Sequence, residues 1–308
     1  MVEENKILRG LIAAPFTPFD GEGRLSLHVL EAFSRYLAAA GVKGVFVGGT
    51  TGEFPSLSIT ERKQLTEAWA NLGRQAGLAV VVHVGDNNLD HACELAAHSA
   101  EQGVDGIALV PPHYFVPADL DSLLACIKRV AERAGALPVY YYDIPGLTGV
   151  KIPCSGLLER AIKEIPNFRG LKFSNGDLVE LQRCLAVDPD RLNILFGCDE
   201  MLLAAQSLGI DGAVGSTYNY LAPLFLKMLD CFEQGNLAEA QQLQLRAVRV
   251  VELLERACPL SVGKLFMKQI GFDFGSVRLP LKALTQAEEA ELSSAVQELG
   301  VLEGAKAV

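Results

Sequence analysis

Lys172 is the residue whose type and position point most directly to chemistry. It lies in the segment 170–174, Gly-Leu-Lys-Phe-Ser, a short apolar run that is typical of a buried strand. Burial of a lysine amine disfavours the ammonium form and leaves the neutral amine available as a nucleophile near neutral pH. A nucleophilic lysine at a strand end indicates Schiff-base chemistry on a carbonyl substrate. The alternative is a lysine whose stem is buried while its ammonium group reaches water.

A second group of chemically useful residues follows another apolar run. The segment 48–53 reads Gly-Gly-Thr-Thr-Gly-Glu. Its glycines allow sharp turns that expose consecutive backbone N–H groups, and the hydroxyls of Thr50 and Thr51 stand beside them. This combination can hold a carboxylate without a formal cation. The alternative is an ordinary turn, because many glycine-rich segments have no other role.

Three consecutive tyrosines, 140–142, precede Asp143. Alternate residues of a strand face opposite sides, so Tyr140 and Tyr142 share a face and Tyr142 lies nearer the strand end. A tyrosine beside a lysine-derived iminium can pass protons and can hydrogen-bond a substrate carboxylate. The alternative is a large packing residue with one polar group, and we favour it for Tyr140 and Tyr141. Asp143 is expected to bring a carboxylate next to the Tyr142 phenol.

Polar residues also follow two later apolar runs. Asp199 and Glu200 come after the run at 193–196, and Ser216 comes after the run at 212–215. Two carboxylates and a hydroxyl at one mouth can bind the hydroxyls of a polyol. The carboxylates can equally favour the N-terminus of the next helix, and position alone does not decide between these readings.

Composition limits the classes of function. The chain has 308 residues, of which 50% are hydrophobic, so it can bury a large core. Its net charge of −10 argues against nucleic acid and anionic membranes as main partners. The seven cysteines are scattered without a C-x-x-C pair, which predicts reduced thiols, a cytoplasmic location and no metal site. The first ten residues lack the apolar run of a secretory signal, and for the histidines, His83 and His113 included, ordinary packing or solvation is the expected role.

Short apolar runs and helical patterns alternate along the first part of the chain. The predicted strands are Leu11–Pro15, Gly44–Gly48, Ala79–Val84, Gly106–Val110, Pro138–Tyr142, Gly170–Phe173, Asn193–Phe196 and Gly212–Gly215. The predicted helices are Leu27–Ala40, Ser58–Ala76, Leu89–Glu101, Ala118–Ala134, Cys154–Glu164, Asp177–Val187 and Glu200–Leu208. Eight such units predict an α/β fold of the (β/α)8 TIM-barrel type rather than a doubly wound open sheet.

The rest of the chain has a different pattern. From Leu221 to about Leu302 it reads as nearly all helical, with Gly235, Gly263, Gly271 and Gly275 as breaks. We therefore predict a barrel domain over 1–225 and a C-terminal helical extension over 226–308 that packs on the barrel. Active sites of such barrels lie at the carboxyl ends of the strands, where the polar residues described above occur.

Four motifs resemble those of the pyruvate-dependent class I aldolases, which comprise the dihydrodipicolinate synthase and N-acetylneuraminate lyase superfamily. They are Gly-Gly-Thr-Thr-Gly-Glu at 48–53, Tyr-Asp-Ile-Pro at 142–145, Gly-Leu-Lys-Phe-Ser at 170–174 and Gly-Ser-Thr-Tyr-Asn at 215–219. The resemblance covers nearly the whole chain, in order and at matching spacing. Within the superfamily the chain resembles the N-acetylneuraminate lyases, because Leu147 stands where dihydrodipicolinate synthases usually carry an arginine for a second carboxylate.

The resemblance implies roles for individual residues. Lys172 would form the Schiff base, Tyr142 would relay protons, and Thr50 would join it in a hydroxyl relay. Tyr114 matches a tyrosine that reaches the site of a neighbouring subunit. The residues implied in binding the substrate are Gly49 and Thr51 for the carboxylate, and Ser174, Gly197, Asp199, Glu200 and Ser216 for the sugar tail. The resemblance also implies a homotetramer with no metal and no diffusible cofactor.

The expected reaction is the reversible cleavage of N-acetylneuraminate to pyruvate and N-acetylmannosamine. Another pyruvate-dependent aldolase or dehydratase, acting on 2-keto-3-deoxy sugar acids, is the main alternative, because Ser174 and Leu260 depart from common tail-binding patterns. Dihydrodipicolinate synthase is a weaker alternative. A non-catalytic protein that binds sugar acids is a third, since a fold alone does not fix a function.

Overall fold

A computed structural model describes residues 8–302 of the protein. Residues 1–7, and with them most of the segment for which no secretory signal is expected, lie outside the described residues, as do residues 303–308. Within residues 8–302, no helix combines the length and the apolar character that crossing a bilayer requires.

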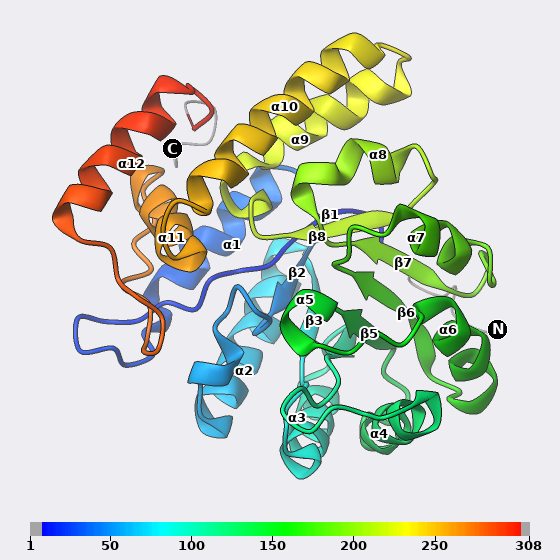
Figure 1. The fold of residues 1–308 in the computed structure, drawn as a ribbon. Helices are drawn as coiled ribbons and strands as arrows, with labels where there is room; N and C mark the ends of the chain where they lie inside the picture. The colour runs from blue at the N-terminus through cyan, green and yellow to red at the C-terminus, as the bar shows by residue number, and fades with distance from the viewer. Residues whose placement is uncertain (1–7, 303–308) are drawn as a thin grey trace.

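The core of the fold is a closed barrel of parallel strands (Figure 1). The strands are β1 (Gly10–Ala13), β2 (Gly44–Val47), β3 (Ala79–His83), β4 (Gly106–Leu109), β5 (Val139–Asp143), β6 (Phe168–Phe173), β7 (Asn193–Phe196) and β8 (Gly212–Gly215). Each strand pairs with its sequence neighbour, and β8 pairs with β1, with Ala13 opposite Gly215. The predicted (β/α)8 barrel is therefore confirmed, and the closing pair excludes an open sheet.

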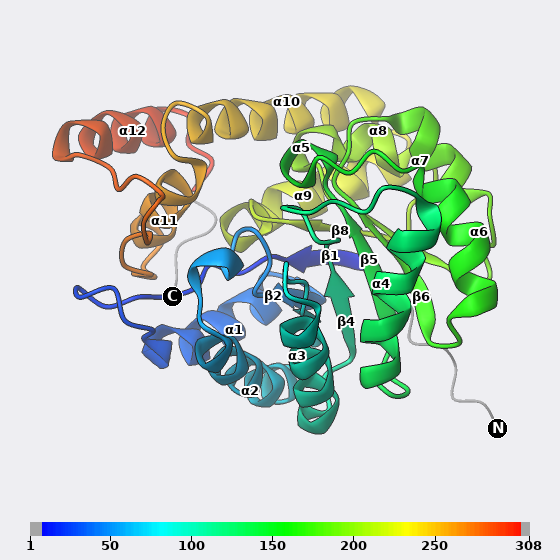
Figure 2. The same ribbon diagram turned by 60° about the horizontal axis from the view of Figure 1, so that its bottom comes forward.

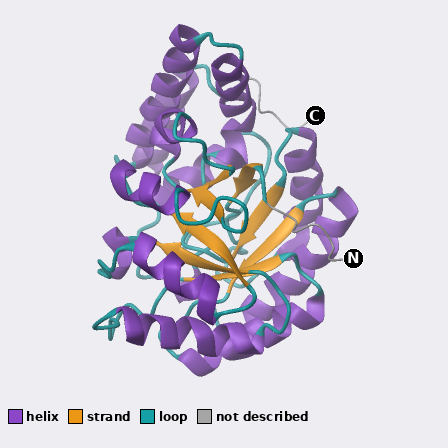
Figure 3. Cartoon of the chain, turned by 90° about the vertical axis from the view of Figure 1, so that its right-hand side faces the viewer, coloured by secondary structure: helices purple, strands orange, loops and turns teal. Residues whose placement is uncertain are grey.

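Helices cover the outside of the barrel on all sides (Figure 3). They are α1 (Leu30–Ala39), α2 (Ile59–Ala76), α3 (Leu89–Gln102), α4 (Leu120–Arg133), α5 (Pro145–Thr148), α6 (Cys154–Glu164), α7 (Leu178–Leu185) and α8 (Leu202–Gln206), with 3-10 turns at η1 (Leu27–Val29), η2 (Phe54–Ser56) and η3 (Asp199–Met201). Local signals fix several starts: Ser58 accepts from the N–H of Glu61 while Glu61 accepts from the N–H of Ser58, a capping box.

The C-terminal part forms α9 (Tyr218–Glu233), α10 (Leu237–Leu254), α11 (Pro259–Gln269) and α12 (Gln286–Glu298). Helices α10, α11 and α12 gather beside the barrel (Figure 2). Two details differ from the prediction. Residues 271–285 are not helical, and Gly263 lies inside α11 rather than at a break. A Cβ at Gly263 would lie 2.5 Å from the ring of Phe16, so glycine is needed there for close helix packing.

The proposed division at 225/226 falls within α9, which runs continuously across it. This helix belongs to the outer layer of the barrel and also packs against α10 and α11. The division into a barrel domain and an extension stays a prediction.

Side chains of the strands form two separate apolar clusters. The cluster inside the barrel contains Phe46, Tyr140, Tyr142 and Leu195, whereas Tyr141 belongs to the cluster between the strands and the outer helices. This is the alternation expected for strands that are covered on both faces. It places Tyr142 in the barrel interior, as predicted.

Gly170 shows how closely β6 and β7 approach. A Cβ at this position would lie 1.9 Å from the carbonyl oxygen of Asn193, which is its partner in β7. No side chain larger than hydrogen fits without displacing backbone. The glycine two residues before Lys172 therefore holds the register that carries the lysine.

We expect Gly170→Ala to lower the free energy of unfolding by about 3 kcal/mol, because the added methyl group overpacks the strand pair. The matched control is Gly156→Ala in α6, where a Cβ meets nothing within 4 Å. That change should raise stability by about 0.5–1 kcal/mol. Urea denaturation of the three proteins checks both, and equal stability of Gly170→Ala and the wild type would contradict the packing argument.

Candidate active site

Lys172 lies on β6 and faces the barrel interior. Its neighbours across the ladder are Tyr142 on β5 and Leu195 on β7, both members of the interior cluster. The ammonium nitrogen lies 4.0 Å from the ring centroid of Tyr142 and 4.0 Å from that of Phe46. The residue is only 4% exposed. The structure therefore buries the head of this lysine as well as its stem.

Within residues 8–302, Lys172 forms no ion pair with a carboxylate. Aromatic rings supply its immediate surroundings instead, and the faces of such rings attract a lysine ammonium group. An amine placed in this way can reach an electrophilic carbon of a ligand in the barrel mouth. This is the arrangement that Schiff-base chemistry needs.

The loop 48–53 lies beside this amine, at the end of β2. The Thr50 hydroxyl is 3.4 Å from the Tyr142 hydroxyl, so the predicted neighbours are brought together. Thr51 is buried, and Gly49 allows the close approach of the Phe46 ring, which a Cβ would meet at 2.9 Å. The Thr50 and Tyr142 hydroxyls thus lie close to each other in the same part of the barrel mouth as the Lys172 amine.

His83 holds the start of this loop, a role that sequence reasoning missed. The backbone N–H of Val110 donates to Nε2 at 3.3 Å, so Nδ1 carries the hydrogen and donates to the Gly48 carbonyl at 3.1 Å. Burial lowers the pKa of His83 well below its ordinary value, with Arg62 and Lys172 acting in the same direction. The neutral imidazole therefore supports the start of the loop. In the sequence, only the position of His83 near a strand end indicates such a role.

Asp199 lies in η3, after β7, and is buried at 6% exposure. Its Oδ2 accepts hydrogen bonds from the N–H of Thr217 at 2.9 Å and from the Thr217 hydroxyl at 2.6 Å. Burial raises the pKa of Asp199 to about 6, against the lowering effect of the Thr217 hydrogen bonds. A Cβ at Gly215 would lie 1.9 Å from Oδ1, so that glycine makes the room for this carboxylate.

Ser174 and Gly197 are packed against each other at the ends of β6 and β7. A Cβ at Gly197 would lie 2.0 Å from the Ser174 hydroxyl, so glycine is required for the serine to occupy its place. Glu200 and Ser216 are partly exposed beside Asp199 and Thr217. The predicted tail-binding residues therefore gather on the strand ends that adjoin Lys172.

Tyr114 and Asp143 are placed differently. Tyr114 is 79% exposed in the loop after β4, and its ring contacts Phe115, so this chain does not bury it with Lys172. Asp143 alternates to the outer face of β5, where Asn175 donates to it at 3.2 Å, and burial raises its pKa. Its carboxylate therefore does not lie beside the Tyr142 phenol as the sequence suggested.

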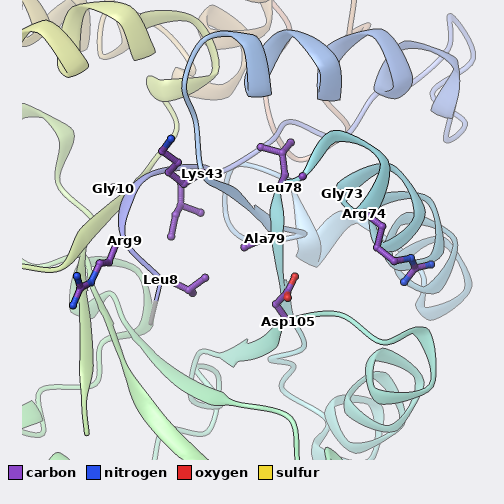
Figure 4. Close-up of a pocket in the computed structure, with 11 residues that line it drawn as sticks. Leu8, Arg9, Gly10, Lys43, Gly73, Arg74, Leu78, Ala79 and Asp105 are labelled. Carbon is purple, nitrogen blue, oxygen red and sulfur yellow. The ribbon is translucent and has the colours of Figure 1, made fainter. Parts of the chain in front are cut away.

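A cavity of about 600 Å³ lies at the opposite end of the barrel and contains none of the predicted site residues (Figure 4). Residues that precede strands line it, among them Arg9, Lys43 and Asp105. The side chains of Arg9, Lys43 and Arg74 point in different directions and do not converge on one point.

Within residues 8–302, no group of three His, Cys, Asp or Glu side chains is arranged to hold a metal ion.

The fold and the site together define a class of protein. It is a closed (β/α)8 barrel with a buried lysine, a tyrosine and two adjacent threonines at the carboxyl ends of its strands, an arrangement that suits carbonyl chemistry. The family model that matches is the dihydrodipicolinate synthetase family, over residues 7–299. The chain belongs to this family.

Known relatives support this assignment over the full length. The chain is 43% identical to the N-acetylneuraminate lyase of Rattus norvegicus over 306 residues, which cover 98% of this chain and 96% of the relative. The solved structure of the Proteus mirabilis N-acetylneuraminate lyase superposes with a TM-score of 0.94 at 34% identity, covering 96% of this chain and 100% of that one. A structure of a Ruminococcus gnavus sialic acid aldolase catalytic lysine mutant gives 0.90 at 28% identity, covering 99% and 98%.

The pKa of Asp199 predicts a pH dependence of stability. The folded value of about 6 lies above the ordinary value of 3.8, so the folded protein holds this proton more tightly. The contribution of Asp199 to the free energy of unfolding of the wild type should therefore fall as the pH rises from about 4 to 6. Asp199→Asn removes the effect and should gain roughly 2 kcal/mol relative to the wild type between pH 4 and pH 7.

Urea denaturation at several pH values measures this difference. The exposed Asp190 provides the control, since Asp190→Asn should track the wild type across the range. If the stability difference between Asp199→Asn and the wild type did not change with pH, burial would not be raising the pKa of Asp199.

Proposed function

We propose that this protein cleaves N-acetylneuraminate reversibly to pyruvate and N-acetylmannosamine. The observation that carries the proposal is the buried amine of Lys172, 4.0 Å from the Tyr142 ring, with the Tyr142 hydroxyl 3.4 Å from the Thr50 hydroxyl. These distances support the proposal that Lys172 is the nucleophile and that Tyr142 and Thr50 form a hydroxyl relay beside it. The relatedness to N-acetylneuraminate lyases over nearly the full length supplies the substrate.

The proposed reaction begins with attack of the Lys172 amine on the C2 keto group of the open-chain sugar acid. Loss of water gives an iminium, which accepts the electron pair of the C3–C4 bond as that bond breaks. The C4 hydroxyl loses its proton toward Tyr142, and the C4 carbon becomes the aldehyde of N-acetylmannosamine. The remaining enamine takes a proton at C3, and hydrolysis of the iminium releases pyruvate and restores the amine.

The surrounding residues are proposed to hold the two ends of the substrate. The N–H groups and hydroxyls of the loop around Gly49 and Thr51 bind the carboxylate, which suits a protein whose net charge is −10, because they need no additional cation. Ser174, Gly197, Asp199, Glu200 and Ser216 adjoin them on the side of β6, β7 and β8, and we propose that they bind the hydroxyls of the sugar tail.

Leu147 supports the lyase over a dihydrodipicolinate synthase. It lies in α5, is 64% exposed, and offers no charge to a second carboxylate. Comparing cleavage rates for N-acetylneuraminate and 2-keto-3-deoxygluconate separates the lyase from an aldolase of the latter class. Tight binding of a sugar acid without turnover or adduct would instead identify a binding protein.

We propose further that the protein works as a homotetramer in the cytoplasm. The exposed side chains of Tyr114, at 79%, and Phe115, at 85%, support an interface at the loop after β4. All seven cysteines are free, which suits a reducing compartment. We also propose that the chain divides into a catalytic barrel over 1–225 and an extension over 226–308 that packs on the barrel.

Lys172→Ala should abolish the adduct that borohydride traps with pyruvate, because no other amine occupies that position. Intact mass spectrometry after reduction in the presence of pyruvate, and then of N-acetylneuraminate, checks this. The control is Lys163→Ala on the exposed face of α6, which should retain the adduct. A full adduct in Lys172→Ala, or normal cleavage of sialic acid by it, would refute the mechanism.

Tyr142→Phe should separate adduct formation from carbon–carbon cleavage. The ring that packs against the Lys172 amine remains, so pyruvate should still be trapped. Loss of the hydroxyl should lower kcat for cleavage by about 10²–10⁴-fold, the usual contribution of a proton-transferring group. Steady-state release of N-acetylmannosamine measures kcat, and an unchanged value would exclude Tyr142 from proton transfer.

A further inference from the structure

Glu53, the last residue of the loop 48–53, has an unusual backbone and an unusual environment. Its φ of 56° is the only positive φ of a non-glycine residue within the described part of the chain. Side chains with a Cβ rarely adopt this left-handed conformation, which costs of the order of 1 kcal/mol. The side chain is fully buried although it carries a carboxylate. A strained backbone and a buried charge together require compensation.

The compensation comes from the C-terminal part of the chain. The Lys264 ammonium, on α11, lies 2.8 Å from Oε1 of Glu53, and both side chains are inaccessible, at 3% and 0% exposure. Lys264 also donates to the Ser276 carbonyl at 2.8 Å and lies 4.4 Å from the ring centroid of Phe19. Burial lowers the pKa of Lys264 below its ordinary value, and contact with the Glu53 carboxylate opposes this effect.

A second contact fixes the other oxygen of the carboxylate. The backbone N–H of Arg278 donates to Oε2 of Glu53 at 2.9 Å. The Arg278 guanidinium in turn binds the Ser56 carbonyl at 2.9 Å and the Glu61 carboxylate at the start of α2. Segment 276–278 therefore contacts the loop from the side of the C-terminal helices. Each oxygen of the Glu53 carboxylate has a partner in the C-terminal part of the chain.

The position of Glu53 sets the position of the threonines. Its backbone N–H donates to the Thr50 carbonyl at 3.0 Å, which closes a turn over residues 50–53. The Thr17 hydroxyl donates to the Gly52 carbonyl at 2.6 Å within the same turn. Movement of Glu53 out of its left-handed conformation would reorient this turn, and with it Thr51. Lys172 stands on β6 and is not attached to this turn.

We infer that the buried Glu53–Lys264 ion pair is a positioning device through which the C-terminal helices hold the loop that binds the substrate carboxylate. Glu53 and Lys264 act through Thr50 and Thr51 rather than on the substrate itself. This inference rests on the proposed function, in which pyruvate contributes the carboxylate and N-acetylmannosamine contributes none. The pair therefore affects one substrate of the condensation reaction and not the other.

The experiment measures condensation of pyruvate with N-acetylmannosamine by Glu53→Gln, Lys264→Met and the double variant. Each single change leaves the other charge buried without its partner, so KM for pyruvate should rise about tenfold or more. KM for N-acetylmannosamine should stay within about twofold, because the tail site is untouched. The double variant removes both charges, so it should recover most of the affinity for pyruvate.

Two further variants keep the test sharp. Glu53→Asp retains the charge but withdraws it by one methylene, so it should raise KM for pyruvate less than Glu53→Gln does. Lys282→Met breaks the exposed pair with Glu288 in the same C-terminal part and should change no kinetic constant. Circular dichroism at the assay temperature identifies any variant that is unfolded, and Glu53→Asp serves if a single charge removal unfolds the protein.

Equal rises in KM for both substrates, or an unchanged KM for pyruvate in folded variants, would overturn the positioning role. The pyruvate concentration that gives half of the maximal borohydride-trapped adduct is an independent readout. On this proposal it depends only on Lys172 and the loop 48–53. If the wild type traps pyruvate but makes no N-acetylneuraminate, the proposed substrate is wrong while the inference is still tested by trapping. If the wild type traps no pyruvate, the proposed function and this inference both fall.

Discussion

The burial of the Lys172 amine is the constraint on which the rest of the site depends. An amine taken out of water loses its hydration, and this protein surrounds it with the faces of two aromatic rings at 4.0 Å rather than with a carboxylate. A carboxylate at that distance would pair with Lys172 and occupy the space that a keto acid needs. Within residues 8–302 no carboxylate pairs with Lys172, and a buried, partly aromatic barrel interior surrounds its amine instead.

The barrel meets this demand through strand geometry. Parallel strands alternate their side chains between the interior and the outer helices, so Lys172 and Tyr142 share the interior while Asp143 faces outward. Glycines then determine where polar side chains fit. Gly170 allows β6 and β7 to approach, Gly197 makes room for Ser174, and Gly215 makes room for Asp199. The polar set at the strand ends is thus a consequence of close backbone contacts below and beside it.

The loop 48–53 is braced from three directions that are remote in sequence. Thr17 binds the Gly52 carbonyl, His83 binds the Gly48 carbonyl, and Lys264 pairs with Glu53. The braces come from three separate parts of the chain, so the loop is held both by the barrel and by α11. The contacts tie the C-terminal helices to the site mechanically.

The sequence by itself determined the barrel, because eight apolar runs separated by amphipathic segments can bury both faces of a parallel sheet in few other ways. It also singled out Lys172 as the candidate for the reactive group, since a lysine inside an apolar run is costly. Its limits appear at particular residues. The sequence pattern predicts a helix break at Gly263, but this glycine packs against Phe16 inside α11. His83 and Glu53 were not recognised as braces, because their partners lie 35 and more than 200 residues away. Only the tertiary structure decided which side chains face Lys172 and which partners hold the loop 48–53, because these depend on contacts between distant segments that no local pattern encodes.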